Sequence, residues 1–251
     1  MRKLLALTAV GTVVLLGGQA VAADLPHYPN IDVPDVDYDV GGSFYLRGSA
    51  ALNFHYAPDV THPFDGTVYP IEEYGYGYSW GAGFGYETGT GLRFDATMDS
   101  VETAGLKITK TSPPANPAEV GDYTLMLRST VALANVYYDL PTIAGFRPYV
   151  GAGIGASYLR TSNVQSLNPP AINPTGVVDS HGGAGNWNFA WALMAGTSYT
   201  ISDHLALDIG YRYLNLGDAV SAPITAGGGT APIEYNNIDA HEIRAGVRYT
   251  F

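Results

Sequence analysis

Charged side chains recur at every second position within several short apolar segments of this chain. If the segments are β-strands, alternate residues share a face, so charges lie on one side and apolar side chains on the other. If these strands enclose a narrow interior, six cations and four anions face it. We expect them to pair with one another, because an unpaired buried charge costs several kcal/mol. They are Arg47, Arg93, Arg128, Arg212, Arg244 and Arg248, with Asp95, Asp99, Asp208 and Glu242. We expect them to form a structural ion network that fills the interior; the alternative is a conducting pore lined by the same charges.

Few other residues are arranged for catalysis or ligand binding. Ser180 and His181 lie beside Asp179 in a glycine-rich stretch, but adjacent residues in a flexible segment cannot orient one another as a catalytic triad does. No glycine-rich phosphate loop precedes a helix and no metal-ligand cluster is present in the sequence, so we expect no enzymatic activity and no cofactor. The net charge of −11 argues against nucleic acid as a partner.

Extended segments must position these charges. The clearest covers residues 74–87, where aromatic residues at even positions alternate with Gly or Ser at odd positions. No helix places a large aromatic residue at every second position on one side. The predicted strands are 42–54, 74–87, 92–103, 123–139, 147–159, 186–200, 204–216 and 241–251.

The segment 123–139 is the least regular of the predicted strands. We expect its apolar set to face outward and Arg128 and Thr130 to face inward with Ala132 and Ala134. Ser129 and Asn135 then violate the outward pattern, which predicts a bulge or a rim position there. The expected outward set is Leu125, Leu127, Val131, Leu133 and Tyr137.

The polarity of the two faces indicates what surrounds the fold. The apolar faces lack charge almost entirely, and nearly every strand arginine falls on the opposite face. A water-soluble ligand barrel would have an apolar interior and a polar exterior, so the pattern favours a barrel with lipid outside and charge inside. Outward aromatic residues predict an interfacial belt rather than a sugar-stacking platform. The belt residues are Tyr74, Tyr76, Trp80, Trp187, Trp191, Tyr211 and Tyr249.

The connections between the predicted strands alternate strictly in length. Short links cover 88–90, 140–145 and 201–203, and long links cover 55–73, 104–120, 161–185 and 217–238. Short periplasmic turns and longer extracellular loops produce this alternation, and an even strand count puts both termini of the chain on the periplasmic side. The predicted fold is all-β: an eight-stranded antiparallel up-and-down transmembrane β-barrel.

The start of the 251-residue chain is typical of an export signal. Arg2 and Lys3 precede an apolar run, and Ala20-Val21-Ala22 is a small-residue cleavage motif. We expect a cleaved signal peptide at 1–22, an acidic periplasmic arm at 23–41 and the barrel at 42–251. The chain has no Cys, so no disulfide stabilises the fold.

Several motifs resemble the small eight-stranded outer-membrane barrels of alphaproteobacteria, the surface-antigen family, similar to an OmpA-type membrane domain without the periplasmic domain. They are Ala22 to Pro26, Phe44 to Leu46, Ala134 to Asp139, Arg147 to Gly155 and Arg244 to Phe251. The resemblance covers the predicted barrel and is specific for fold and compartment rather than activity. The spacing of Asp239 and His241 is also similar to the Asp–His pair of outer-membrane aspartyl-type proteases. Against a protease, His241 has outward parity and the spacing of Asp95 and Asp99, the candidate second pair, fits poorly.

The leading hypothesis is a non-enzymatic integral outer-membrane protein of a Gram-negative bacterium, a structural envelope component and surface antigen with four extracellular loops. A small-solute porin and an adhesin that binds through its loops are the alternatives. The expected partners are outer-membrane lipid, lipopolysaccharide and the barrel assembly machinery, which would recognise the C-terminal strand ending at Phe251. The sequence does not identify a ligand for the loops.

Overall fold

The computed structural model describes residues 41–56, 59–61, 68–70, 75–110, 121–167, 178–226 and 229–251. The predicted signal peptide (1–22) and the predicted arm (23–41), apart from Gly41, lie outside these ranges. Within them, no helix is sufficiently long and apolar to serve as a membrane span.

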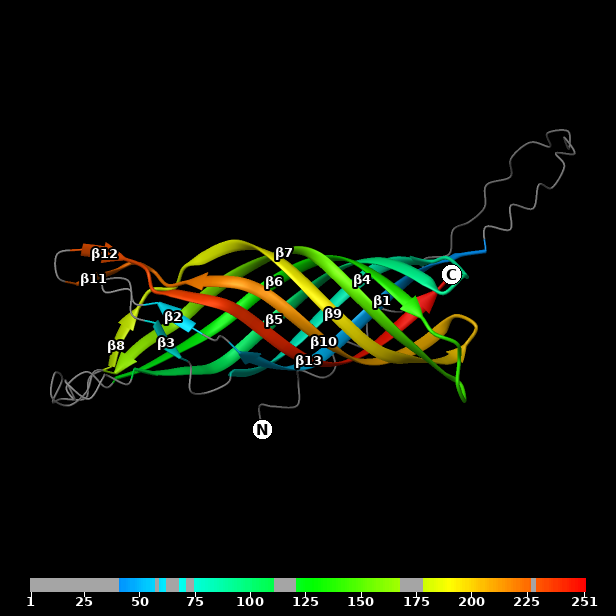
Figure 1. Cartoon of the computed structure of the whole chain (residues 1–251), viewed down its shortest axis with the longest axis horizontal. Helices are drawn as coiled ribbons and strands as arrows, with labels where there is room; N and C mark the ends of the chain where they lie inside the picture. The colour runs from blue at the N-terminus through cyan, green and yellow to red at the C-terminus, as the bar shows by residue number, and fades with distance from the viewer. Residues whose placement is uncertain are drawn as a thin grey trace, which may run out of the picture. The chain divides into compact units, whose positions relative to one another are not determined.

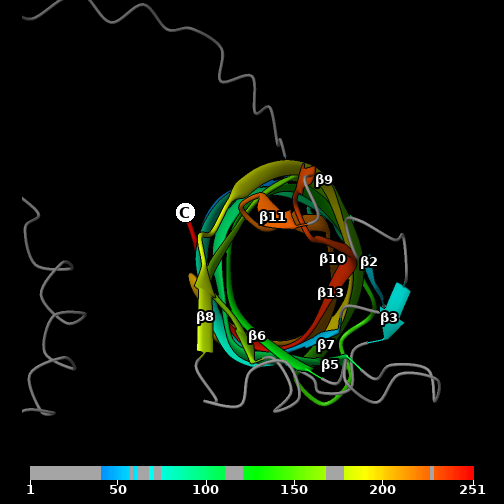
Figure 2. The ribbon, with the colours of Figure 1, turned by 90° about the vertical axis from the view of Figure 1, so that its left-hand side faces the viewer.

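Eight long strands among the described residues pair antiparallel, each with its neighbour along the chain, and the first pairs with the last to close a ring (Figures 1 and 2). They are β1 (Ser43–Tyr56), β4 (Gly75–Glu87), β5 (Leu92–Lys110), β6 (Gly121–Asp139), β7 (Phe146–Leu167), β9 (Gly185–Ser202), β10 (Leu205–Val220) and β13 (Glu234–Thr250). The predicted eight-stranded antiparallel barrel is therefore confirmed.

The two ends of the barrel differ in their connections. At one end, which we call the turn end, short links join β4 to β5, β6 to β7 and β9 to β10, and the C-terminus lies there (Figure 1). At the other end, the loop end, the described parts of the long links contain five short strands (Figure 1). These are β2 (Asp59–Thr61), β3 (Val68–Pro70), β8 (Val178–His181), β11 (Ile224–Ala226) and β12 (Gly229–Ala231).

The strands continue further at the loop end than the sequence pattern predicts. β5 and β6 stay paired as far as Lys110 and Gly121, and β13 begins at Glu234 rather than at the predicted residue 241. Main-chain hydrogen bonds sustain a strand whatever its side chains are, whereas alternation is visible only where one face meets an apolar phase. The alternation of polar and apolar residues therefore could not predict the additional length of these strands.

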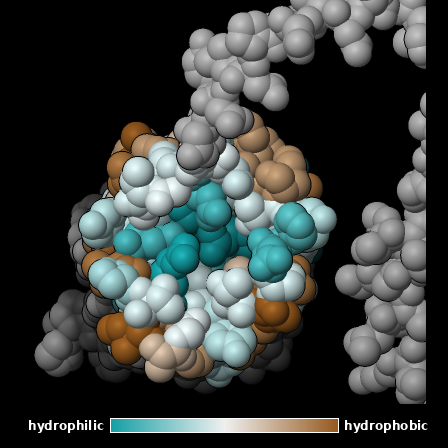
Figure 3. All heavy atoms as spheres, turned by 90° about the vertical axis from the view of Figure 1, so that its right-hand side faces the viewer, coloured by the Kyte–Doolittle hydropathy of each residue, from teal (hydrophilic) through white to brown (hydrophobic). Residues whose placement is uncertain are grey.

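The outer surface of the barrel is apolar. Leu52, Ile154 and Ile209 are each at least 60% exposed there. Seen from the turn end, hydrophobic side chains form an outer ring around a hydrophilic centre (Figure 3). Of the predicted belt, Tyr76, Trp80, Trp187, Tyr211 and Tyr249 are exposed on this surface, Trp191 is half-buried against Tyr213, and Tyr74 lies outside the described residues.

The prediction for β6 is wrong: its two faces are reversed. Leu127, Val131 and Leu133 are buried inside the barrel, and the Arg128 side chain is 65% exposed on the outer surface. Ser129 and Asn135, which seemed to break the pattern, share the interior face with the leucines, and the β6 ladders with β5 and β7 are regular at both residues. The predicted bulge is therefore absent at these two positions.

The physical reason for this reversal is that the interior has two different halves. Toward the turn end it is charged, but toward the loop end it is packed mainly with apolar side chains, and β6 crosses both halves. Val131 and Leu133 are inward because that half of the barrel has a hydrophobic core. The core residues are Val101, Leu127, Val131, Leu133, Leu159, Ala190, Ala192, Leu214, Leu216, Ala219, Ile233, Tyr235, Ile238 and Ala240.

Candidate functional site

Four buried side chains near the middle of the barrel form a closed ring of ion pairs, which we call the charge quartet: Asp99 on β5, Arg212 on β10, and Glu242 and Arg244 on β13. Arg212 donates to Asp99 at 2.7 Å and to Glu242 at 2.6 Å. Arg244 donates to the other oxygen of Asp99 at 2.7 Å and to Glu242 at 2.9 Å. Two cations face two anions, so the quartet is formally neutral and crosses the interior.

Hydroxyl groups of β1 and β4, the two strands that lie between β13 and β5 in the barrel wall, add hydrogen bonds to the charge quartet. Ser49 on β1 accepts a hydrogen bond from Arg244 at 2.5 Å, and Ser79 on β4 donates to Glu242 at 2.9 Å. The carboxylate of Asp99 fits against β4 because residue 81 is Gly: a Cβ there would overlap that carboxylate. Charge-assisted bonds of this kind are the strong ones in proteins.

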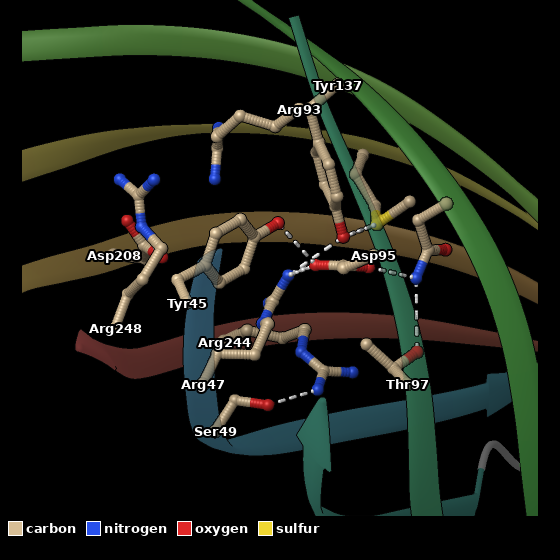
Figure 4. Close-up of polar contacts among 12 residues, drawn as sticks. Tyr45, Arg47, Ser49, Arg93, Asp95, Thr97, Tyr137, Asp208, Arg244 and Arg248 are labelled. Atoms are coloured by element: carbon tan, nitrogen blue, oxygen red, sulfur yellow. Dashed lines mark hydrogen bonds and ion pairs between the residues drawn. The ribbon is translucent and has the colours of Figure 1, made fainter. Parts of the chain in front are cut away.

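A second network lies between the quartet and the turn end (Figure 4). Arg47 donates to Asp95 at 3.0 Å and to the Tyr137 hydroxyl at 2.8 Å. Asp95 also accepts from Tyr45 at 3.1 Å and from Asn135 at 2.7 Å. This carboxylate therefore has three donors, two from β1 and one from β6, which offset the cost of removing it from water.

The remaining interior cations are also paired. Arg93 donates through Nε and Nη2 to Asp139, at 3.0 and 2.7 Å, and its guanidinium lies 4.9 Å from the ring centre of Tyr137. Arg248 donates to Glu87 at 3.0 Å and lies 3.7 Å from Asp208. Each arginine inside the charged half thus has a carboxylate partner among the described residues.

Nine of the ten predicted network residues lie in the barrel interior, and Arg128 is the exception. Its partner is Glu102 on the outer surface, 3.0 Å away. The sequence reasoning missed Asp139 and Glu87 as anions. Asp139 shares the odd parity of Ser129 and Asn135, so a strand 123–139 read with odd positions inward would have revealed it.

Beside the charge quartet, the residues that the structure describes leave little room for solvent. A cavity of about 20 Å³ lies beside the quartet, lined by Arg47, Tyr137, Tyr149 and Asp208 among others, and it has space for about one water molecule. The hydrophobic core follows toward the loop end. The arrangement is suited to filling the barrel and to holding its strands in register.

Among the residues considered for catalysis, those whose side chains the structure describes are not brought together. Asp239 accepts a hydrogen bond from Asn215 at 2.7 Å, and His241 on the outer surface bonds to Tyr211 at 2.6 Å, whereas Asp95 and Asp99 lie inside the barrel. The side chains of Ser180 and His181 fall outside the described residues. Within the described ranges, no group of three or more potential ligands could hold a metal ion.

A closed barrel with an apolar outer surface, aromatic residues on that surface and ion pairs within defines the class of transmembrane β-barrels. A family model, the outer membrane protein beta-barrel domain, matches residues 12–251, and the chain belongs to this family. The turn end is therefore the periplasmic end and the loop end the extracellular one.

Three known proteins illustrate the similarity. An uncharacterized protein of Brucella suis is 33% identical over 243 residues, covering 83% of this chain and 84% of its own. A putative adhesin of Rickettsia conorii is 26% identical, covering 63% of this chain and 61% of its own. The crystal structure of Neisserial surface protein A covers 84% of this chain and 99% of its own, at 20% identity and a TM-score of 0.51, which shows a shared fold.

Proposed function

We propose that this protein is a closed, non-enzymatic outer-membrane barrel, a structural envelope component that displays its extracellular strands and loops as a surface antigen. The observation that carries the proposal is the filled interior: the charge quartet crosses the barrel, and a hydrophobic core occupies its extracellular half. A solute would have to break buried ion pairs and separate packed leucines to pass. The filled interior therefore weighs against the small-solute porin.

The extracellular half of the barrel favours a role in presentation. The β5–β6 pair continues well past Glu102 and Arg128, the first charged outward residues on that side, and β7 pairs with β8 beyond them. Strands that continue past the lipid-facing band hold the loops at a fixed distance from the membrane. Binding residues commonly lie on loops that a rigid scaffold positions.

Adhesion through these loops is the second candidate. The similarity to a putative adhesin of Rickettsia conorii supports it, together with the projecting strands. An adhesin would bind through the same extracellular strands and loops that the structural proposal describes as a displayed surface antigen. The two candidates differ only in whether the loops bind another surface.

A strain comparison separates these candidates. Three strains would carry the full chain, a chain whose residues 111–120 are replaced by a short Gly-Ser linker, or no chain. If the role is structural, we expect the strain with the shortened loop to resist bile salts as well as the full-chain strain does. We also expect its attachment to surfaces to be unchanged. Loss of attachment with the shortened loop would favour the adhesin, and no difference in bile-salt resistance between the full-chain and null strains would refute the envelope role.

The C-terminal strand supports a further part of the proposal, recognition by the barrel assembly machinery. Tyr249 and Phe251 are exposed on the outer surface, and the Phe251 amide donates to the Phe44 carbonyl at 3.0 Å, in line with the β1–β13 seam. The strand that closes the barrel thus ends in exposed aromatic side chains. Replacing Phe251 with Ala should slow assembly, measured as loss of the heat-modifiable band in membranes.

A further inference from the structure

Three adjacent strands change from apolar to charged outward residues at matching positions. Glu102 on β5 pairs in register with Arg128 on β6, and Arg128 pairs in register with Arg160 on β7. Toward the periplasm, the outward residues of the same strands include Met98 and Ile154, which are more than 60% exposed. The charged row therefore marks the level at which the lipid-facing band ends in the outer leaflet.

The charges of this row are not balanced. Glu102 accepts a hydrogen bond from the Tyr78 hydroxyl at 2.8 Å and pairs with Arg128 at 3.0 Å. Arg160 is exposed and has no ion-pair partner among the residues that the structure describes. Two like charges directly opposite each other on neighbouring strands destabilise a sheet. An anion held between Arg128 and Arg160 would remove that repulsion.

A hollow on the outer surface lies at this row. It measures about 510 Å³ and is lined by Tyr76, Tyr78, Met126, Arg128, Arg160 and Ser162 among others. Its lining combines aromatic and thioether groups with two guanidinium groups and the Glu102 carboxylate, which is already paired with Arg128. Such a lining fits an amphiphile that has both an apolar part and a phosphate, because guanidinium matches the geometry of phosphate oxygens.

We propose that Arg128 and Arg160 bind the phosphate of a phosphorylated glycolipid of the outer leaflet, the lipid A part of lipopolysaccharide, with Tyr76, Tyr78 and Met126 against its apolar part. Glu102 holds Arg128 in position from the other side. The site lies on the outer surface, so it does not depend on whether the interior conducts or the loops bind. It gives the barrel a specific contact with the leaflet in which it is embedded.

Binding of fluorescent bisphosphorylated lipid A to the detergent-purified full chain tests the proposal. Arg128→Gln and Arg160→Gln should each weaken binding about tenfold, because each removes one charge-assisted contact. Arg147→Gln is the matched control: it removes the same charge from an exposed residue at the periplasmic end, and binding should not change. The heat-modifiable shift of each variant on gels verifies that the barrel is folded.

Two further arms identify the source of the phosphate. Lipid A treated with phosphatase should bind the wild-type protein no better than the Arg128→Gln/Arg160→Gln variant binds the intact lipid. Inorganic phosphate at the lipid's own concentration should not compete. Unchanged binding of lipid A by folded Arg128→Gln and Arg160→Gln variants would overturn the proposal. So would binding of the phosphatase-treated lipid to the wild-type protein as tight as that of intact lipid A, or displacement of lipid A by equimolar inorganic phosphate.

Discussion

Replacing Asp99 with Asn removes one anion from the charge quartet while keeping the size of the side chain. Asp99 accepts two charge-assisted hydrogen bonds at 2.7 Å, from Arg212 and Arg244, and its side chain is 1% exposed. Each such bond contributes about 1.5–3 kcal/mol, and loss of one partner from a buried pair costs about 3–5 kcal/mol. We therefore expect Asp99→Asn to lower the free energy of unfolding by about 3–5 kcal/mol.

A double-mutant cycle isolates the electrostatic part of this cost. Arg244→Gln leaves the quartet with excess negative charge, and the Asp99→Asn/Arg244→Gln double variant restores neutrality with the 2.6 Å pair of Arg212 and Glu242 intact. The double variant should therefore be more stable than the sum of the single effects predicts, by about 1–3 kcal/mol.

The assay is guanidinium unfolding of the barrel in phospholipid vesicles, followed by tryptophan fluorescence. Glu102→Gln is the control on the same strand: it breaks an ion pair on the outer surface and should cost about 1 kcal/mol or less. Strictly additive single and double variants, or an Asp99→Asn effect no larger than that of Glu102→Gln, would refute the assignment of a coupled buried quartet.

Two other predictions concern the interior. Gly81→Ala should destabilise the barrel by about 1–3 kcal/mol or more, because its methyl group would overlap Asp99. Gly48→Ala is the control and should be tolerated, because no atom lies within 4 Å of a Cβ at that position. Equal unfolding midpoints for the two variants would contradict this prediction. Since the chain has no Cys, single cysteines at positions 127 and 128 report the faces of β6. A water-soluble maleimide should modify Arg128→Cys in intact proteoliposomes and spare Leu127→Cys, and the reverse result would restore the orientation that the sequence pattern suggests.

The sequence was most informative where one face of a strand meets lipid and the other meets charge. In β4 and in the last part of β13 both conditions hold, so parity alone predicted the outward side chains and the inward Glu242, Arg244 and Arg248. Antiparallel closure followed from the alternation of short and long connections. These features are local and repeat every two residues, so a single sequence contains them.

The sequence was misleading where the interior is itself apolar. On β6, Leu127, Val131 and Leu133 face a hydrophobic core, and the outward face has the small residues Ala132 and Ala134, so hydrophobicity points the wrong way. Which half of the barrel is charged depends on contacts between strands far apart in the chain. Asp99 meets Arg212 and Arg244 across the barrel, and no local pattern specifies such partners.

The filled interior is the central claim, and single-channel recording of the purified full chain in planar lipid bilayers tests it most directly. With the charge quartet and the hydrophobic core in place, the wild-type protein should insert without stable open-channel steps across a range of voltages. Uniform, long-lived conductance steps from the folded wild-type protein would show a continuous water path through the barrel and would contradict the account.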